Sequence, residues 1–406
     1  MASPAHSENP HAVRKVLHVM RLPMGGLFRH VRDLVAGQQA AGIAAGVICA
    51  EPPADDGVSA RRLAELAPKC GLGLHVIPMG RLPGVGDAVN IREVRALADW
   101  LKPDVLHGHG AKGGMLARLA PRDGARVVRV YTPHGGSLHY NALSPQGFVY
   151  HTAERLMRRR TDGLIFESEF SRAAYLAKIG RPGAPTAVIH NGLTEDEFLP
   201  VPHGDMAADF LFIGELRMLK GVSTLIEAAS TFSRPVHIRI VGAGPDRARF
   251  EELAKTAGSA ARFEFMGAMP AREAFRLGRI AVMPSWNESL PYVALETAAA
   301  GIPLIATRVG GMAEIFGPDA TRLVPAQNAS ALAAAMMAAL ADPEAAAASA
   351  ARLRARVMTH FSASQMVEGV NGFYDRLLEA RKARLLAHTG RLAAAPVAPG
   401  LTGAGQ

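Results

Sequence analysis

The chain has 406 residues, of which 49% are apolar and 20% charged, and its formal net charge is +9. This length and composition predict two packed domains and exclude wholesale disorder, and two cysteines are too few for a disulfide framework or a four-cysteine zinc site. No uncharged apolar run reaches the roughly 18 residues of a membrane helix. Residues 1–14 form a polar tail without an apolar signal core, so we expect a cytoplasmic protein.

The excess positive charge predicts an acidic partner. Its densest cluster runs from Arg158 to Arg160, beside Arg155, on a predicted helix that also carries Phe148 and Tyr150. Two explanations of this cluster are equally good. It is either a solvent-exposed helix face without a partner, or a surface that binds an anionic membrane or a lipid pyrophosphate. We expect no nucleic acid partner, because only 6% of the residues are aromatic and no DNA- or RNA-binding signature is present.

Short apolar runs alternate with helix-length segments through the first half of the chain, which predicts a parallel sheet with helices on both faces. The predicted strands cover residues 16–20, 46–50, 74–78, 104–107, 162–168 and 187–192, and the predicted helices cover 27–35, 59–66 and 91–101. Glycines and prolines between Pro78 and Asn90 predict a long loop.

Glycines and histidines follow several of these strands, where the carboxyl ends meet at one sheet edge. Gly25 and Gly26 follow the first strand without completing a Gly-x-Gly-x-x-Gly fingerprint, so a nicotinamide cofactor is not supported. His109, Lys112 and His134 follow two later strands. No Asp-x-Asp or paired carboxylate spacing accompanies them, which favours contact with a sugar hydroxyl over a metal site. Loop capping remains an equal alternative for His109 and Lys112.

The second half repeats the alternation after a hinge at residues 200–206. Strands are predicted at 209–214, 236–241, 263–267, 280–283 and 304–307, and helices at 222–229, 271–277, 329–340, 343–357 and 361–386. The predicted organisation is a tail at 1–14, a first domain at 15–199, a second at 200–360, a crossing helix at 361–388 and a disordered tail at 389–406.

Two carboxylates lie eight positions apart where the strand at 280–283 gives way to a helix. Glu288 falls on the loop, and Glu296 lies inside the helix among apolar neighbours, where an unpaired carboxylate would be costly. Glu296 therefore needs a partner, either an arginine such as Arg308 or the hydroxyls of a sugar. The helix begins near Pro291, and free N–H groups at a helix N-terminus suit a phosphate.

A second cluster of charge follows the strand at 209–214. Arg217 and Lys220 lie on a loop before a helix, where cations can stabilise the charge that develops on a departing diphosphate. Gly242 follows the next strand in a tight turn.

The Glu288 to Glu296 pair, followed by an alanine-rich helix and Gly301-Ile-Pro-Leu-Ile-Ala-Thr307, resembles family 4 of the nucleotide-sugar-dependent glycosyltransferases. Segments from about Val16 to Tyr374 agree in order and spacing. The resemblance implies the GT-B fold, an α/β architecture of two Rossmann-like, doubly wound domains that face each other across a cleft. It also implies that the last helix crosses back onto the first domain.

The resemblance implies a retaining transfer of a hexose-type sugar from a nucleoside-diphosphate sugar to a saccharide or lipid-linked acceptor. A role in bacterial envelope or exopolysaccharide biosynthesis is expected, at the inner face of the membrane, without metal or other cofactor. Glu288 and His134 are the implied catalytic residues. The implied donor-binding residues are Gly25, Gly26, Arg217, Lys220, Gly242, Ser289, Leu290 and Glu296, with Glu296 on the ribose and Arg217 and Lys220 on the diphosphate. Glu215 stands where the family often has an arginine.

Other functions remain open. A nucleotide-sugar epimerase of the same fold would turn over the donor without an acceptor. A catalytically silent, sugar-nucleotide-binding scaffold protein is the alternative from another class. A phosphorylase of the glycogen type is disfavoured, since it needs a pyridoxal lysine and a far longer chain.

Overall fold

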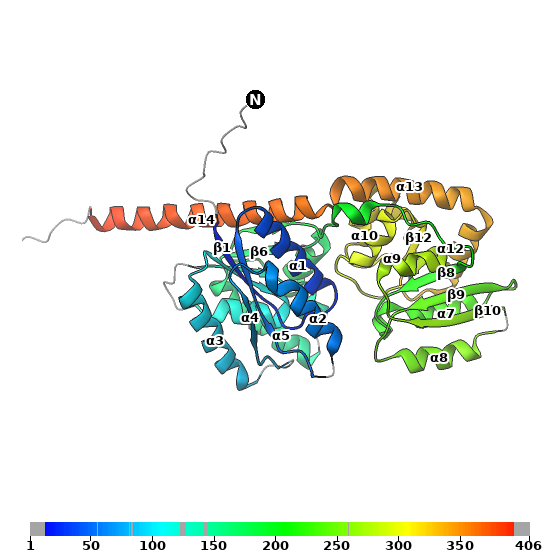
Figure 1. The fold of residues 1–406 in the computed structure, drawn as a ribbon, viewed down its shortest axis with the longest axis horizontal. Helices are drawn as coiled ribbons and strands as arrows, with labels where there is room; N and C mark the ends of the chain where they lie inside the picture. Colours follow the sequence, from blue (N-terminus) through cyan, green and yellow to red (C-terminus); the bar gives the residue numbers. More distant parts are fainter. Residues whose placement is uncertain are drawn as a thin grey trace, which may run out of the picture.

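The structure is a computed structural model that describes residues 13–54, 56–80, 82, 84–121, 127–141, 144–258 and 260–393. Two α/β domains lie side by side (Figure 1). The predicted tails at 1–14 and 389–406 fall mostly outside the described residues. Val13, however, is buried, and its N–H donates to Asp375 at 2.8 Å, so the first domain includes it.

The first domain contains a seven-stranded, all-parallel sheet. Across the sheet the strands are β3 (Leu74–Ile77), β2 (Ala44–Ala50), β1 (Lys15–Val19), β4 (Val105–His109), β5 (Val128–Thr132), β6 (Gly163–Phe166) and β7 (Thr186–Val188). Its helices are α1 (Gly25–Ala40), α2 (Gly57–Leu66), α3 (Gly86–Leu101), α4 (Gly110–Leu119), α5 (Pro145–Met157) and α6 (Glu169–Lys178), with 3-10 turns η1 (Ala67–Lys69), η2 (Gly136–His139) and η3 (Arg158–Arg160).

Two predictions for this domain were wrong. The loop expected between Pro78 and Asn90 is shorter, because α3 already begins at Gly86. His109 lies within β4 and not after the strand, which was predicted to end at His107, and helix α4, which was not predicted, follows directly at Gly110. Both differences have the same cause: glycines at Gly86 and Gly110 open helices here, although glycine usually marks a loop.

The second domain contains a five-stranded parallel sheet in the order β10 (Ala261–Gly267), β9 (Val236–Val241), β8 (Ala208–Ile213), β11 (Gly278–Met283) and β12 (Leu304–Ala306). Its helices are α7 (Val222–Ser230), α8 (Arg247–Thr256), α9 (Ala271–Ala274), α10 (Tyr292–Ala299), α11 (Met312–Phe316), α12 (Ala329–Ala341) and α13 (Pro343–His360). The 3-10 turns are η4 (Glu195–Phe198) in the linker, η5 (Met218–Lys220), η6 (Phe275–Leu277) and η7 (Gly317–Arg322). Alternating apolar residues of β8 and β9, such as Phe210 and Ile238, build its core against α7 and α12.

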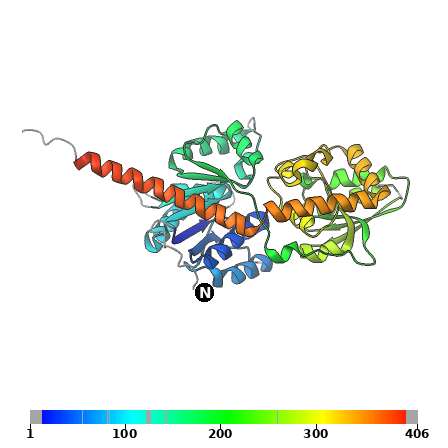
Figure 2. The same ribbon diagram turned by 90° about the horizontal axis from the view of Figure 1, so that it is seen from above.

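The last helix, α14 (Ala363–Ala393), returns to the first domain. Figure 2 shows it continuing the line of α13 and then lying along the first domain. Its residues Met366, Val370 and Tyr374 are buried in one cluster with Val16 and Leu34. The helix extends to Ala393, beyond the predicted end at residue 388.

The described helices are too short or too polar to cross a membrane singly. None of them alone has both the length and the apolar composition of a span. The pair α12 and α13 meets the criterion only in combination, and the two helices are bent by 104° at their junction.

Both sheets reverse their strand order at one point, which lies between β1 and β4 in the first domain and between β8 and β11 in the second. The loops that follow the two strands at such a point run in opposite directions, and a crevice for a ligand forms between them at the carboxyl ends of the strands. These loops carry most of the predicted site residues.

Candidate active site

A cavity of about 350 Å³ lies between the domains and is lined by residues of both. The predicted site residues that line it are Gly25, Gly26, His134, Lys220, Glu288, Ser289 and Leu290. Arg217, Gly242 and Glu296 do not belong to the described lining. Seven of the ten predicted residues, far apart in sequence, therefore meet at one cavity.

Lys220 and Glu288 form an ion pair at the switch point of the second sheet. Lys220 Nζ lies 2.7 Å from Glu288 Oε1, and Ser285 Oγ donates to the same oxygen at 2.8 Å. Glu288 is buried, and Lys220 comes from the loop after β8. The pair provides a cation and a carboxylate in fixed relation at the edge of the cavity.

Close backbone contact between two loops positions this pair. Trp286 N–H donates to Leu219 O at 2.8 Å, and Gly221 lies against Pro284 with a φ of 72°. A Cβ at Gly221 would lie 1.9 Å from Pro284 O, so glycine is required here. Gly242 has a comparable role, since its Cβ would lie 1.9 Å from Gly214 O. Gly242 thus packs the turn after β9 and does not face the cavity.

Glu296 lies below the cavity and is held by Arg29 of α1. Arg29 donates through Nη1 to Glu296 and through Nη2 to Glu197, where the distance is 2.6 Å. The guanidinium also lies 4.3 Å from the centre of the Tyr292 ring. Burial raises the pKa of Glu296, and Arg29 only partly opposes that shift.

An arginine does pair with Glu296, but it is Arg29 and not the suggested Arg308. Arg308 instead donates to Ala320 O at 2.6 Å. Arg29 lies one helical turn after Gly26, so the segment Gly25-Gly26-Leu27-Phe28-Arg29 carried a signal that the sequence analysis did not use.

The charge around the cavity is predominantly negative. Arg217 is half exposed and lies 3.6 Å from Glu215. Among the described lining residues, the carboxylates are Glu167, Glu215 and Glu288 and the cation is Lys220. A bound diphosphate would therefore benefit from a further cation, and Arg217, although outside the described lining, lies one turn before Lys220, whose N–H donates to Arg217 O.

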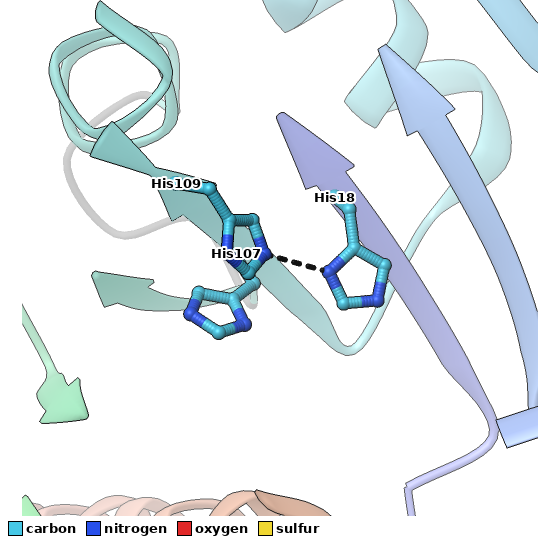
Figure 3. A group of neighbouring side chains, drawn as sticks. All are labelled: His18, His107 and His109. Carbon is cyan, nitrogen blue, oxygen red and sulfur yellow. Dashed lines mark hydrogen bonds between the residues drawn. The ribbon is translucent and has the colours of Figure 1, made fainter. Parts of the chain in front are cut away.

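Behind the cavity the first domain contains a cluster of buried histidines, of which Figure 3 shows His18, His107 and His109. His18 projects from β1, and the other two project from β4. His109 also contacts His134, with 3.1 Å between Nδ1 of His109 and Nε2 of His134. Burial lowers the pKa of His134 to about 3, so the ring is neutral at physiological pH.

A second cavity of about 580 Å³ lies within the first domain. It shares Leu27 and His134 with the interdomain cavity. Its wall includes Tyr140 and Tyr150, whose rings stack with centroids 4.8 Å apart. Lys112, another lining residue, forms an ion pair with Asp87 at 2.7 Å. His134 thus stands between two cavities, which suits a reaction that joins two substrates.

Comparison with known families supports a transferase. Residues 207–342 match the family described as glycosyl transferases group 1, and residues 25–192 match the glycosyl transferase 4-like domain. EpsD of Bacillus subtilis, which is named as a glycosyltransferase, is 32% identical over 264 residues that cover 59% of this chain and 68% of EpsD. The chain belongs to the group 1 glycosyltransferases. This confirms the predicted family and enzyme class.

Solved structures show that this glycosyltransferase has the predicted GT-B fold. Sucrose-phosphate synthase from Thermosynechococcus elongatus is 22% identical, with a TM-score of 0.75 over 90% of this chain and 100% of that one. HepE from Anabaena, in a complex with UDP and glucose, is 18% identical with a TM-score of 0.72 over 89% of this chain and 99% of HepE. Alignments with several D-inositol 3-phosphate glycosyltransferases span only 52% to 57% of those relatives' length.

Several residues at the site were missed by sequence reasoning. They are Arg29, Ser285, Tyr292, Asn191, His18 and His30. All except Ser285 make contacts between segments that are far apart in the chain. Arg29 and Glu296, for example, are separated by 267 positions. Local periodicity contains no information about such pairs.

Proposed function

We propose that this glycosyltransferase moves a hexose from a nucleoside-diphosphate sugar to a saccharide or lipid-linked acceptor with retention of configuration. The observation that carries the proposal is the interdomain cavity, where Lys220 and Glu288 of one domain face His134 of the other. The donor would occupy this cavity, and the acceptor would enter from the cavity beside Tyr140 and Tyr150. The relative HepE was solved with UDP and glucose, which supports a donor of this class.

The chemistry follows from these positions. The acceptor hydroxyl attacks the anomeric carbon on the face that the diphosphate leaves, so a new C–O bond forms as the bond to phosphate breaks. The departing phosphate oxygen takes the hydroxyl proton. Lys220 stabilises the charge that develops on the diphosphate, assisted by Arg217 and the N-terminus of α10. No metal or other cofactor is required by this scheme.

Thermal denaturation with UDP-, GDP- and ADP-sugars tests the donor. A ligand that binds only the folded protein raises Tm by mass action, so we expect one base and one sugar to stabilise the protein. Lys220→Ala should weaken that donor's binding about tenfold or more, whereas Lys255→Ala, an exposed lysine on α8, should bind like wild type. No stabilisation by any of the sugars, with or without saccharide acceptors, would contradict the proposal.

Product analysis separates the transferase from its alternatives. The anomeric configuration of the product, read by NMR, should match that of the donor. An epimerase would convert the donor without acceptor, and a silent scaffold would bind it without any conversion. Glu288→Gln should bind the donor but lose most turnover, because the carboxylate lies at the reacting end of the cavity. Inverted product would rule out the retaining mechanism.

We also propose that the enzyme works in the cytoplasm, at the inner face of the membrane. On α5 and η3 the exposed Phe148, Arg155, Leu156 and Arg159 recur at helical spacing on one face. This face lies on the same helix as Tyr150, which lines the second cavity. Tyr150 points to the other side of this helix from Phe148, so we propose that the acceptor's head group passes the helix to reach the second cavity, and that the product is an envelope polysaccharide or exopolysaccharide.

Sedimentation with anionic liposomes tests this surface. Replacement of residues 158–160 by glutamate should abolish binding that wild type shows. A matched reversal of three exposed cations on the second domain, at Arg249, Lys255 and Arg262, should leave it. Equal loss in both variants would indicate a general charge effect, and no binding by wild type would remove the proposed membrane contact.

A further inference from the structure

The buried histidines form a continuous hydrogen-bonded chain that ends at His134. It begins on α14, where Asn371 Oδ1 accepts from Gln38 Nε2 at 3.2 Å. Gln38 Oε1 lies 2.9 Å from His18 Nε2, and His18 Nδ1 lies 3.0 Å from His109 Nε2. His109 Nδ1 then contacts His134 Nε2 at 3.1 Å. Figure 3 shows the central link between His18 and His109.

The rings in this chain are neutral. His18 and His109 are almost completely buried, and Gln38 is buried beside them. Burial lowers the pKa of His18 to about 4 and that of His109 well below its ordinary value. The hydrogen-bond partners within the chain are amides and other imidazoles. A neutral imidazole has one N–H donor and one bare acceptor nitrogen, so each ring must donate on one side and accept on the other.

The amide at the inner end gives the chain its direction. Because Gln38 uses its NH₂ group to donate to Asn371, its carbonyl oxygen faces His18 and accepts from Nε2–H. His18 Nδ1 is then bare and accepts from Nε2–H of His109. His109 Nδ1 is bare in turn and accepts from Nε2–H of His134. His134 is left with a bare Nδ1, for which the described residues provide no hydrogen-bond partner.

We propose that His18 and His109, oriented by Gln38, are positioning residues that hold His134 as the Nε2-protonated neutral tautomer and so present its bare Nδ1 to a substrate hydroxyl. The backbone supports this placement, since His134 has a φ of 49° and holds its ring between the two cavities. A bare ring nitrogen accepts a hydrogen bond from a hydroxyl group, whereas an ionised phosphate has no hydrogen to donate to it. The substrate contact of His134 is therefore a sugar hydroxyl and not the diphosphate, a step that rests on the proposed function.

Metal binding is the competing explanation for the same rings. Two triads, His18 with His107 and His109, and His30 with His109 and His134, have nitrogens within 4.8 Å of one another. In the first triad His107 already contacts the Tyr374 hydroxyl at 2.6 Å and the Thr132 hydroxyl at 2.8 Å.

In the second triad His30 Nδ1–H donates to Asn191 Oδ1 at 3.0 Å, so Nε2 of the neutral ring is bare, and the described residues offer it no partner. If a metal were held there by the two nitrogens that face each other, His109 Nδ1 and His134 Nε2, both would have to be bare. The proton that links these two atoms in the proposed chain would then be absent. The two explanations thus predict different protonation at one atom, His134 Nε2.

NMR of the full-length protein labelled with ¹⁵N-histidine distinguishes these states, because protonated and bare ring nitrogens have well-separated shifts. We expect His18, His109 and His134 of wild type each to carry the proton on Nε2, with His134 assigned by His134→Gln. A proton on His134 Nδ1 would overturn the proposal. So would bare nitrogens at both His109 Nδ1 and His134 Nε2, the pattern expected after addition of Zn²⁺ to a metal site. This measurement needs no transferase activity, so it stands even if the proposed function fails.

Variants of Gln38 test the consequence for turnover. Gln38→Met removes the group that sets the direction, and we expect mixed His134 tautomers and a fall in kcat of about tenfold, the worth of one hydrogen bond, with little change in donor affinity. Gln39→Met, at the exposed neighbouring position, is the matched control. Unchanged tautomer and kcat in Gln38→Met would refute the positioning role.

Discussion

The buried histidines make a quantitative prediction about stability in acid. Burial lowers the pKa of His18 to about 4 from 6.5. The unfolded chain therefore takes up a proton at a higher pH than the folded protein does. This contribution to the free energy of unfolding is fully present above pH 6.5 and is lost as the pH falls from 6.5 to 4. At about 1.4 kcal/mol for each pKa unit, it amounts to about 3 kcal/mol in total and about 2 kcal/mol between pH 7.5 and pH 5.

Urea-induced unfolding at several pH values measures this effect. A hydrogen-exchange pulse on β1 and β4 reports the first domain separately from the second. His18→Gln should lower the free energy of unfolding at neutral pH, yet lose about 2 kcal/mol less than wild type between pH 7.5 and pH 5. His203→Gln, which removes an exposed histidine, should follow wild type. Parallel curves for His18→Gln and wild type would refute the reasoning, because they would mean that His18 is protonated equally in both states.

Three further predictions concern contacts at the site. Arg29→Ala should lower the free energy of unfolding by about 3 kcal/mol, because it leaves largely buried carboxylates without their cation. The control Arg32→Ala, at a more exposed arginine, should lower it by less than 1 kcal/mol. Equal losses in urea-induced unfolding would contradict this prediction. Gly221→Ala should destabilise by about 2 kcal/mol or more and impair donor binding, since its Cβ would meet a backbone oxygen. Gly267 also has a positive φ, but a Cβ there would meet open space. Gly267→Ala should therefore lose less stability than Gly221→Ala, and the difference measures the steric clash at Gly221. An equal loss would show that backbone strain alone destabilises both variants. Glu215→Gln should tighten donor binding about fivefold by calorimetry, because it removes a negative charge that faces the diphosphate; weaker binding would place the diphosphate elsewhere.

The sequence was sufficient to predict the architecture and most of the cavity. Apolar strand periodicity and loop glycines are local signals, and parallel strands bring their carboxyl ends to one edge whatever the details of packing. That is why Gly25, Lys220 and Glu288 were located correctly at one cleft. The pairing of Glu296 was not predictable, because its partner lies on another domain. Arg308 was the nearest arginine in sequence, but it lies on the bend after β12, where its Nη2 donates to Ala320 O.

The histidine chain was out of reach for a different reason. His109 had a plausible local role in the sequence, as a loop cap or a sugar contact, and His18 was one residue of an apolar strand with no role assigned to it. Their connection depends on the register of β1 and β4, which places His18 beside His107 and lets the side chain of His18 reach His109. It also depends on Gln38 and Asn371, which belong to helices at opposite ends of the chain. Register and docking of a crossing helix are tertiary properties that a single sequence does not display.

The return of α14 to the first domain has a consequence for synthesis of the protein. Met366, Val370 and Tyr374 fill the same core as Val16 and Leu34, yet they are translated after the entire second domain. On the ribosome the second domain can therefore mature first, while the first domain waits with an open groove along its sheet. Chains arrested before residue 363 should expose that groove and recruit chaperones that bind apolar surface. The first domain is thus the first to be translated and the last to complete its core.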